Sequence, residues 1–243
     1  MLRPEKGAVC VTGAAGGIGL AVVQRLLAEG YGVSAWDLAP GPLAEIGDPN
    51  FIFETIDVRD LAAMQLAAQR ASEKFGVVHG LVSLAAIFRR QALAEIDDET
   101  WDLHFAINLK GSLFAAQSVL PMMRARRAGS IVLFSSTQAR TGGALNAAYA
   151  ATKGGILGLM RSMALDVARD NIRVNSVSPA IADTAMPRMA MNEAVLEQRA
   201  AANPLKRIGT PDDMAEAVIF LLDPQNSFMT GQDLRVTGGA ALF

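Results

Sequence analysis

The sequence that decides the fold is AVCVTGAAGGIG, residues 8–19, together with the amphipathic segment that follows it to Glu29. A short apolar run at 8–12, a glycine cluster at 13–19 and a helical pattern at 20–29 predict a strand, a tight turn and a helix. In such a unit the glycines remove the Cβ atoms that would keep backbone N–H groups and the helix N-terminus from a pyrophosphate. A dinucleotide site is therefore predicted, although a glycine cluster alone also fits an ordinary flexible turn.

The next apolar run, Gly32 to Trp36, stops at Asp37. A carboxylate about 20 residues beyond the glycine turn can accept hydrogen bonds from both adenosine ribose hydroxyls and would repel a 2′-phosphate. No basic residue lies inside the turn or directly after Asp37, so nothing there would neutralise that phosphate. The sequence favours NAD over NADP, the alternative being that Asp37 only caps a turn.

Strand-like and helix-like segments alternate along the rest of the chain. This alternation predicts an α/β fold, a single Rossmann-like, doubly wound parallel sheet of about seven strands with helices on both faces. No linker or repeat interrupts it, so residues 1–243 are expected to form one cofactor-binding and catalytic domain. The expected strands are 8–12, 32–36, 51–56, 80–84, 130–134, 172–178 and 233–236, and the expected helices include 20–29, 61–75, about 100–126 and 211–222.

Two connections depart from the regular pattern. Residues 38–50 contain three prolines and two glycines, which breaks any long crossover helix. Asp57 follows the third strand, where it would either contact an adenine amino group or cap the helix from Leu61. Asn108 lies inside the long helix before Leu109-Lys110-Gly111, a poor choice for a helix interior that suggests a functional local break, unless it is an exposed surface residue.

The chemistry-bearing residues follow the fifth strand. Ser136 ends that strand, where ligands of open parallel sheets bind. Tyr149 and Lys153 are four residues apart, so on a helix they share one face. A nearby cation favours the phenolate, and the sequence therefore predicts a Tyr149 pKa below the usual value of about 10. Farther on, the Met-rich segment 182–204 is expected to be either a substrate lid or ordinary core.

Composition narrows the class of protein. Hydrophobic residues make up 51% of the chain and aromatic residues 6%, which predicts an aliphatic core. The formal charge of −2, without long runs of one sign, argues against a nucleic-acid partner or a membrane surface. Cys10 is the only cysteine, so no internal disulfide is expected. Arg3, Glu5 and Lys6 make residues 1–10 unlike a signal peptide, and a cytoplasmic location is expected.

Together these motifs resemble the short-chain dehydrogenase/reductase family across nearly the whole chain. The matching residues are the glycine turn from Thr12 to Gly19, Asn108 in Asn-Leu-Lys-Gly, Ser136 thirteen positions before Tyr149, Lys153, and the segment 179–184, together with 207–211, 230–232 and Gly238-Gly239. The order and spacing of the whole set agree with the family, which makes the resemblance much more specific than any single motif.

The resemblance implies a role for each matching residue. Tyr149 would be the proton donor or acceptor, Ser136 would bind the substrate oxygen, Lys153 would hold the nicotinamide ribose and lower the Tyr149 pKa, and Asn108 would support a proton relay through water. Hydride would move to or from the cofactor while the acid or base handles the proton. The implied cofactor-binding set is Thr12, Gly13, Gly17, Ile18, Gly19, Asp37 for the ribose, Asp57 for the adenine, Val58, Ala85, Tyr149, Lys153, Pro179 and Thr184. No metal ligand set is expected.

Three positions depart from the family pattern. Ser83-Leu84-Ala85-Ala86 stands where Asn-Asn-Ala-Gly is usual, and altered packing rather than lost chemistry is expected. Ala180 replaces a glycine after Pro179. Thr237 replaces an acidic residue near a subunit interface, in a family that commonly forms homotetramers.

The predicted function is an NAD-dependent oxidoreductase that acts on a secondary alcohol or ketone. The substrate stays open among sugars, cyclic diols, hydroxy acids and 3-oxoacyl thioesters, and the alternatives are a catalytically silent dinucleotide-binding protein or an epimerase of the same family. Family topology suggests the pocket residues Phe88, Arg89, Gln138, Leu145, Asn146, Met186 and Met189. Arg89, Arg90, Arg140 and Arg188 are candidates for binding an anionic group, or else are solvated loop charges.

Overall fold

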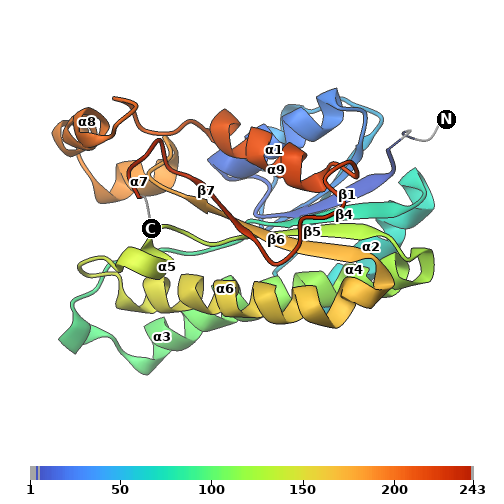
Figure 1. Ribbon diagram of the computed structural model, residues 1–243, viewed down its shortest axis with the longest axis horizontal. Helices are drawn as coiled ribbons and strands as arrows, with labels where there is room; N and C mark the ends of the chain where they lie inside the picture. The colour runs from blue at the N-terminus through green and yellow to red at the C-terminus, as the bar shows by residue number, and fades with distance from the viewer. Residues whose placement is uncertain (1–3, 5, 242–243) are drawn as a thin grey trace.

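A seven-stranded parallel sheet forms the centre of the protein, in the order β3-β2-β1-β4-β5-β6-β7 (Figure 1). The computed structural model describes residue 4 and residues 6–241, so the charges at Arg3 and Glu5 lie outside the described residues. The strands are β1 Ala8–Thr12, β2 Gly32–Asp37, β3 Phe51–Thr55, β4 Val78–Ser83, β5 Gly129–Phe134, β6 Ile172–Pro179 and β7 Asp233–Val236. The predicted fold class is confirmed, with strand ends within two residues of those expected.

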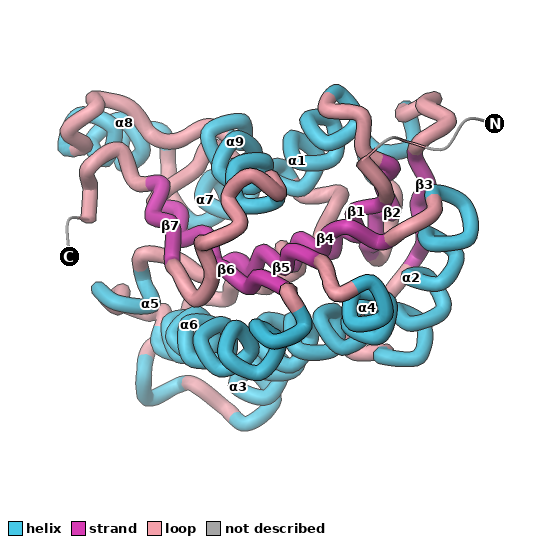
Figure 2. The backbone as a smooth tube through the Cα atoms, turned by 45° about the vertical axis from the view of Figure 1, so that its right-hand side comes forward, coloured by secondary structure: helices cyan, strands magenta, loops and turns pink. Residues whose placement is uncertain are grey.

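Helices cover both faces of the sheet (Figures 1 and 2). On one face α1 (Gly17–Ala28) lies beside α9 (Pro211–Leu222), and Leu26 and Leu221 belong to the same buried cluster. On the other face lie α2 (Leu61–Phe75), α4 (Gly111–Arg126) and α6 (Ala147–Val167), whose buried cluster includes Met123 and Met160. Both cores are almost entirely aliphatic, as the composition predicts.

Shorter elements complete the described chain. The broken connection 38–50 contains only a 3-10 helix, Gly41–Glu45, as predicted. The remaining short helices are Leu93–Glu95 (3-10), α3 Asp98–His104, α5 Gln138–Thr141, Ala168–Asp170 (3-10), α7 Ala185–Ala190 and α8 Glu193–Ala202. No helix in the described part of the chain is long and apolar enough to span a bilayer.

The glycine turn is tighter than the sequence suggested, because α1 begins at Gly17 and not at Leu20. Gly13 has a positive φ of +65°, and a Cβ there would lie 2.6 Å from the Ala85 nitrogen. A Cβ on Gly19 would lie 2.2 Å from the Gly13 carbonyl oxygen. Both glycines are therefore required for the chain to turn from β1 directly into α1.

The expected long helix at 100–126 is wrong in detail, because it is three segments. After α3 the chain forms a π-helix from Phe105 to Lys110, which contains Asn108, and then continues as α4. A π-helix carries an extra residue per turn and is frequent at functional sites. The predicted break at Asn108 is confirmed, and its cause is the set of hydrogen bonds described below.

Helix starts follow the capping residues. Asp60, not Asp57, caps α2 and accepts a hydrogen bond from the Ala63 N–H at 3.0 Å, so the capping alternative for Asp57 is wrong. Thr210 and Asp213 form a reciprocal capping box at the start of α9.

The strand order reverses between β1 and β4, because β1 leads to β2 on one side and the chain returns to β4 on the other. In open parallel sheets, ligands bind at this switch point, beyond the carboxyl ends of the strands. The glycine turn after β1 and the loop after β4 meet there.

Candidate active site

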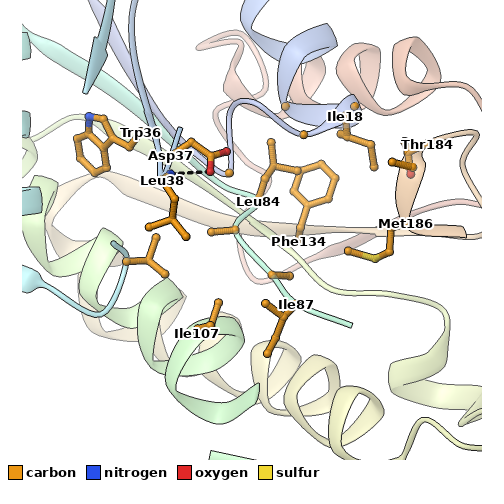
Figure 3. Close-up of a pocket in the computed structure, with 18 of the residues that line it drawn as sticks. Ile18, Trp36, Asp37, Leu38, Leu84, Ile87, Ile107, Phe134, Thr184 and Met186 are labelled. Atoms are coloured by element: carbon orange, nitrogen blue, oxygen red, sulfur yellow. Dashed lines mark hydrogen bonds between the residues drawn. The ribbon is translucent and has the colours of Figure 1, made fainter. Parts of the chain in front are cut away.

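A cavity of about 420 Å³ opens at the switch point of the sheet (Figure 3). The glycine turn, the ends of β2 and β4, and the start of the segment after β6 form its walls. It is lined by twelve of the thirteen residues expected to bind the cofactor: Gly13, Gly17, Ile18, Gly19, Asp37, Asp57, Val58, Ala85, Tyr149, Lys153, Pro179 and Thr184. The structure therefore brings together residues that are spread over 172 positions of the sequence.

Asp37 closes the end of the cavity next to β2. Its carboxylate accepts a hydrogen bond from the Ala15 N–H at 2.9 Å. It accepts another from the Leu38 N–H at 2.7 Å (Figure 3). Each carboxylate oxygen has a second lone pair, so the group still has acceptor capacity for two hydroxyls. The carboxylate also places negative charge next to the glycine turn.

Asp57 is paired with a residue that the sequence analysis missed. Arg59, two residues on, donates from Nε to both carboxylate oxygens at 2.9 Å and also lines the cavity. The Arg59 guanidinium holds the pKa of Asp57 below its usual value. This basic side chain lies on the cavity wall, where the ion pair with Asp57 engages it. The signal in the sequence is an arginine two positions after the aspartate that follows the third strand.

Thr12 is the one predicted cofactor-binding residue that does not line the cavity. It is fully buried, and its hydroxyl oxygen accepts hydrogen bonds from the Leu84 and Ala85 N–H groups, both at 3.2 Å. Thr12 thus ties the end of β1 to the loop after β4 and supports the cavity wall from behind.

Tyr149 and Lys153 lie on the same face of α6, one turn apart, as their spacing predicts. The Lys153 Nζ atom is 5.6 Å from the centroid of the Tyr149 ring and donates a 2.8 Å hydrogen bond to the Phe134 carbonyl at the end of β5. Lys153 is only 3% exposed. An ammonium donor is therefore held on the floor of the cavity beside the phenol.

The predicted low pKa of Tyr149 is wrong for the protein alone. Burial raises the pKa of Tyr149 to about 12, while a hydrogen bond with Ser136 opposes the rise. Burial also lowers the pKa of Lys153 from 10.5 to about 7. The spacing of the two residues reflects only the attraction between them, whereas burial penalises the charged form of each.

Ser136 lies in an adjoining cavity of about 160 Å³. Its Oγ accepts a hydrogen bond from the Gln138 N–H at 3.2 Å, so its own proton is the one donated to the Tyr149 oxygen or, in its place, to another oxygen on the cavity side. The ring of Phe88 meets the Tyr149 ring edge-on, with the centroids 4.9 Å apart, and forms one wall. The two cavities share Ile18, Ser135, Tyr149, Pro179, Thr184 and Met186.

Asn108 is fully buried and does not line either cavity. Its side-chain oxygen accepts from the Ile87 N–H at 2.8 Å, and its side-chain nitrogen donates to the Ile87 carbonyl and to Thr152 Oγ1, both at 3.1 Å. The side chain thus clamps the loop after β4 to α6. This positioning role explains the π-helix, since the clamp requires Asn108 to face inward.

The unusual sequence Ser83-Leu84-Ala85-Ala86 repacks the centre of the sheet. Ser83 Oγ donates to Ser112 Oγ at 3.1 Å, and Ser112 Oγ donates to the Asn108 carbonyl at 2.8 Å. Small side chains therefore keep the end of β4 hydrogen-bonded to the start of α4.

None of the four candidate anion-binding arginines lines either cavity, and three of them are engaged elsewhere. Arg188 pairs with Asp183 and Glu193, and Arg140 pairs with Asp233 at 3.3 Å. Arg90 donates to the Ala190 carbonyl, and Arg89 does not line either cavity. Among the suggested pocket residues, Phe88, Gln138, Met186 and Met189 line a cavity, whereas Leu145 and Asn146 line neither cavity and Asn146 is hydrogen-bonded to Gln138.

The residues fit a dinucleotide bound along the larger cavity. A Cβ on Gly17 would lie 2.8 Å from Thr184 Cγ2, so the glycine keeps the passage between α1 and the segment after β6 open. Asp37 stands at one end of this passage with hydroxyl-accepting oxygens, and Lys153 and Tyr149 stand at the other with a donor and a titratable phenol. Such a fold and site define an oxidoreductase that uses a nicotinamide cofactor.

Comparison with known proteins agrees. Residues 13–241 match a family described as Enoyl-(Acyl carrier protein) reductase. The chain is 36% identical over 235 residues to an acetoacetyl-CoA reductase from Synechocystis, covering 96% of both chains. The protein belongs to the short-chain dehydrogenase/reductase family.

Solved structures of the family superpose closely on the protein. A glucose/ribitol dehydrogenase-type member from Brucella melitensis has a TM-score of 0.91 at 30% identity, with 100% of both chains covered. ElxO with NADP bound has a TM-score of 0.88 at 27% identity, covering 96% of this chain and 98% of its own. Because this relative binds NADP, the fold alone does not choose between the two cofactors.

Proposed function

We propose that this protein is an NAD-dependent oxidoreductase that interconverts a secondary alcohol and the matching ketone. The observation that carries the proposal is the pair of adjoining cavities, which meet at Tyr149 and together extend from the glycine turn and Asp37 to Lys153 and Ser136. A bound nicotinamide supplies the hydride acceptor or donor. The protein binds the substrate oxygen and moves its proton.

Each of the three residues then has a separate task. The Ser136 hydroxyl is oriented by the Gln138 N–H and donates to the substrate oxygen. The Tyr149 phenol exchanges the proton with that oxygen as general acid or base. Lys153, anchored to Phe134, holds a ribose hydroxyl and brings positive charge toward the phenol when it is protonated. Asn108 positions the loop that carries Phe88.

Asp37 supports NAD as the cofactor. Its negative charge lies at the glycine turn, and the nearest arginine of the cavity wall, Arg59, is paired with Asp57. A 2′-phosphate at that end would meet a carboxylate without an unpaired cation to balance it.

We also propose the surroundings in which this activity takes place. The chain works as one domain, residues 1–243, with segment 182–204 as a substrate lid, since Met186 and Met189 line the larger cavity. It acts in the cytoplasm on a small molecule. It assembles as a homotetramer, and Leu165 on α6, which is 81% exposed, supports a subunit interface on that helix. Light scattering of the purified chain tests the assembly.

The test of the function is turnover of a panel of alcohols and ketones, followed by NADH absorbance with NADP(H) in parallel. The Tyr149→Phe variant should lose about 10²- to 10⁴-fold in kcat, because a positioned acid or base contributes that much. It should keep measurable NAD binding in calorimetry. Binding without any turnover, the same in wild type and variant, would indicate a silent dinucleotide-binding protein, and product analysis would reveal an epimerase.

A further inference from the structure

We infer that Gln138 is a substrate-recognition residue, which donates a hydrogen bond to a second, uncharged oxygen of the substrate. Asn146 holds the Gln138 amide in the orientation that makes it a donor. The inference deepens the proposed function and rests on it for the identity of the reacting oxygen. It depends on the geometry of a partly buried amide pair beside Ser136.

The amide pair has a defined direction. Asn146 Nδ2 donates to Gln138 Oε1 at 3.1 Å, so the oxygen of Gln138 is used and its nitrogen remains for the cavity. Gln138 lines the cavity that contains Ser136 and Tyr149. Asn146 Oδ1 is buried without a hydrogen-bond partner. If both amides were reversed, the NH2 group of Asn146 would take that position and leave two buried donors without a partner, which costs more than one unpaired acceptor.

The chain around the pair is shaped to hold it. A Cβ on Gly143 would lie 2.9 Å from Asn146 Nδ2 and 3.0 Å from Gln138 Oε1, so only glycine leaves room for both groups. Leu145, next to Asn146, has a positive φ of +66°, a strained conformation for a leucine. Local strain of this kind persists only where the surrounding structure enforces it.

Asn146 is diverted from its ordinary role. It occupies the N-cap position of α6, where an asparagine side chain usually accepts a hydrogen bond from the helix, but no such bond is formed. The residue is only 8% exposed. Its side chain therefore gives up helix stabilisation and serves Gln138 instead.

The site selects an uncharged acceptor. In the described part of the chain, the residues that line the cavity are apolar or uncharged, so a carboxylate there would find no cation. The Gln138 backbone N–H also bonds to Ser136 Oγ, which places this residue close to the reacting oxygen. Hydroxyl and carbonyl oxygens near the reacting carbon meet both conditions, whereas free hydroxy acids do not.

The test compares ketones of matched chain length, one of which carries a further oxygen function. Ethyl acetoacetate is paired with 2-heptanone, in which methylene groups replace the ester carbonyl and the ester oxygen, and 4-hydroxy-2-butanone is paired with 2-pentanone, in which a methyl group replaces the hydroxyl. The readout is the ratio of the two kcat/KM values within each pair, measured with NADH. General damage to the site lowers both values by the same factor and leaves this ratio unchanged. The wild type should favour the oxygenated partner in at least one pair, and the pair identifies the type of acceptor.

Three variants separate recognition from folding. Gln138→Met should reduce the preferred ratio roughly tenfold, mainly through KM, because one hydrogen bond of the bound substrate is lost. In Asn146→Asp the new carboxylate can only accept a hydrogen bond, so it pairs with Gln138 Nε2 and the Gln138 oxygen turns toward the cavity. This variant should reduce the ratio although Gln138 is intact. Gln24→Met, on the exposed surface of α1, is the matched control and should keep the wild-type ratio.

A binding measurement separates this inference from the proposed function. Calorimetry with the NAD⁺-loaded wild type gives the Kd ratio of each ketone pair without turnover. Turnover with no preference in either pair, or a preference that Gln138→Met leaves unchanged, overturns the inference and leaves the proposed function standing. A Gln138-dependent binding preference without turnover of any substrate supports the inference and overturns the proposed function.

Discussion

Replacing Lys153 by methionine should stabilise the protein while it removes activity. Lys153 is almost fully buried, and burial lowers its pKa from 10.5 to about 7. Methionine has a similar volume and carries no charge, so it removes the cost of keeping an amine in an apolar site. The hydrogen bond from the Nζ atom to the Phe134 carbonyl is lost.

The size of the effect depends on pH. Because the native pKa lies below the unfolded one, the unfolded chain binds more protons between pH 7 and 10.5, and stability rises with pH in that window. From these pKa values Lys153 costs about 4 kcal/mol at pH 7 and about 2 kcal/mol at pH 9. Losing the bond to Phe134 costs about 1 kcal/mol. Lys153→Met should therefore stabilise the protein by about 3 kcal/mol at pH 7 and about 1 kcal/mol at pH 9.

Urea unfolding at fixed protein concentration, at pH 7, 8 and 9, measures this difference. Tyr149 and Cys10 have raised pKa values, so they affect stability only from about pH 9 upward and do so alike in both proteins, and the difference between the two proteins excludes them. Lys74→Met is the control, since Lys74 also donates to a backbone carbonyl, that of Phe51, but from an exposed position. A Lys153→Met protein that is less stable than wild type at pH 7, or equally pH-dependent, would refute the burial argument.

Two further predictions concern the cofactor site. Gly19→Ala should destabilise the protein by roughly 1 to 3 kcal/mol and weaken NAD binding, because the new Cβ would contact the Gly13 carbonyl oxygen. In Gly158→Ala, on α6, the new Cβ would have nothing within 4 Å, so this change should stabilise the protein by up to about 1 kcal/mol. Thermal unfolding and calorimetry check both, and equal effects of the two changes would contradict the close-packing argument. Asp37→Asn should raise the ratio of NADP to NAD kcat/KM about tenfold, because it removes the charge that repels a 2′-phosphate. An unchanged ratio in steady-state assays would assign cofactor choice to other residues.

Local signals explain how much of the fold the sequence predicts. The bounds of α2 and α9 match the expected ranges at both ends, because turn, proline and capping residues lie at those positions. Asp57 was harder to assign, since three aspartate or arginine side chains follow one another in four residues. Only the structure assigns the cap to Asp60 and the ion pair to Arg59.

The candidate site divides in the same way. Spacing predicts that Tyr149 and Lys153 share a face, but the burial that dominates their pKa values depends on elements far away in the sequence. The Gln138 amide is oriented by Asn146 across a loop with two strained or glycine-dependent positions. No periodic pattern carries such a contact, so the substrate side of the site is visible only in three dimensions.

The clamp formed by Asn108 also has a consequence for how the chain folds. Its amide bonds to partners 21 and 44 residues away, on two different segments. Contacts between distant segments form late, after the cost of closing long loops has been met. Until the loop after β4 and α6 have both docked, this buried amide lacks its partners, and a partly folded chain does not gain from it. The active-site loop is thus ordered only in molecules whose central sheet and helices are already assembled.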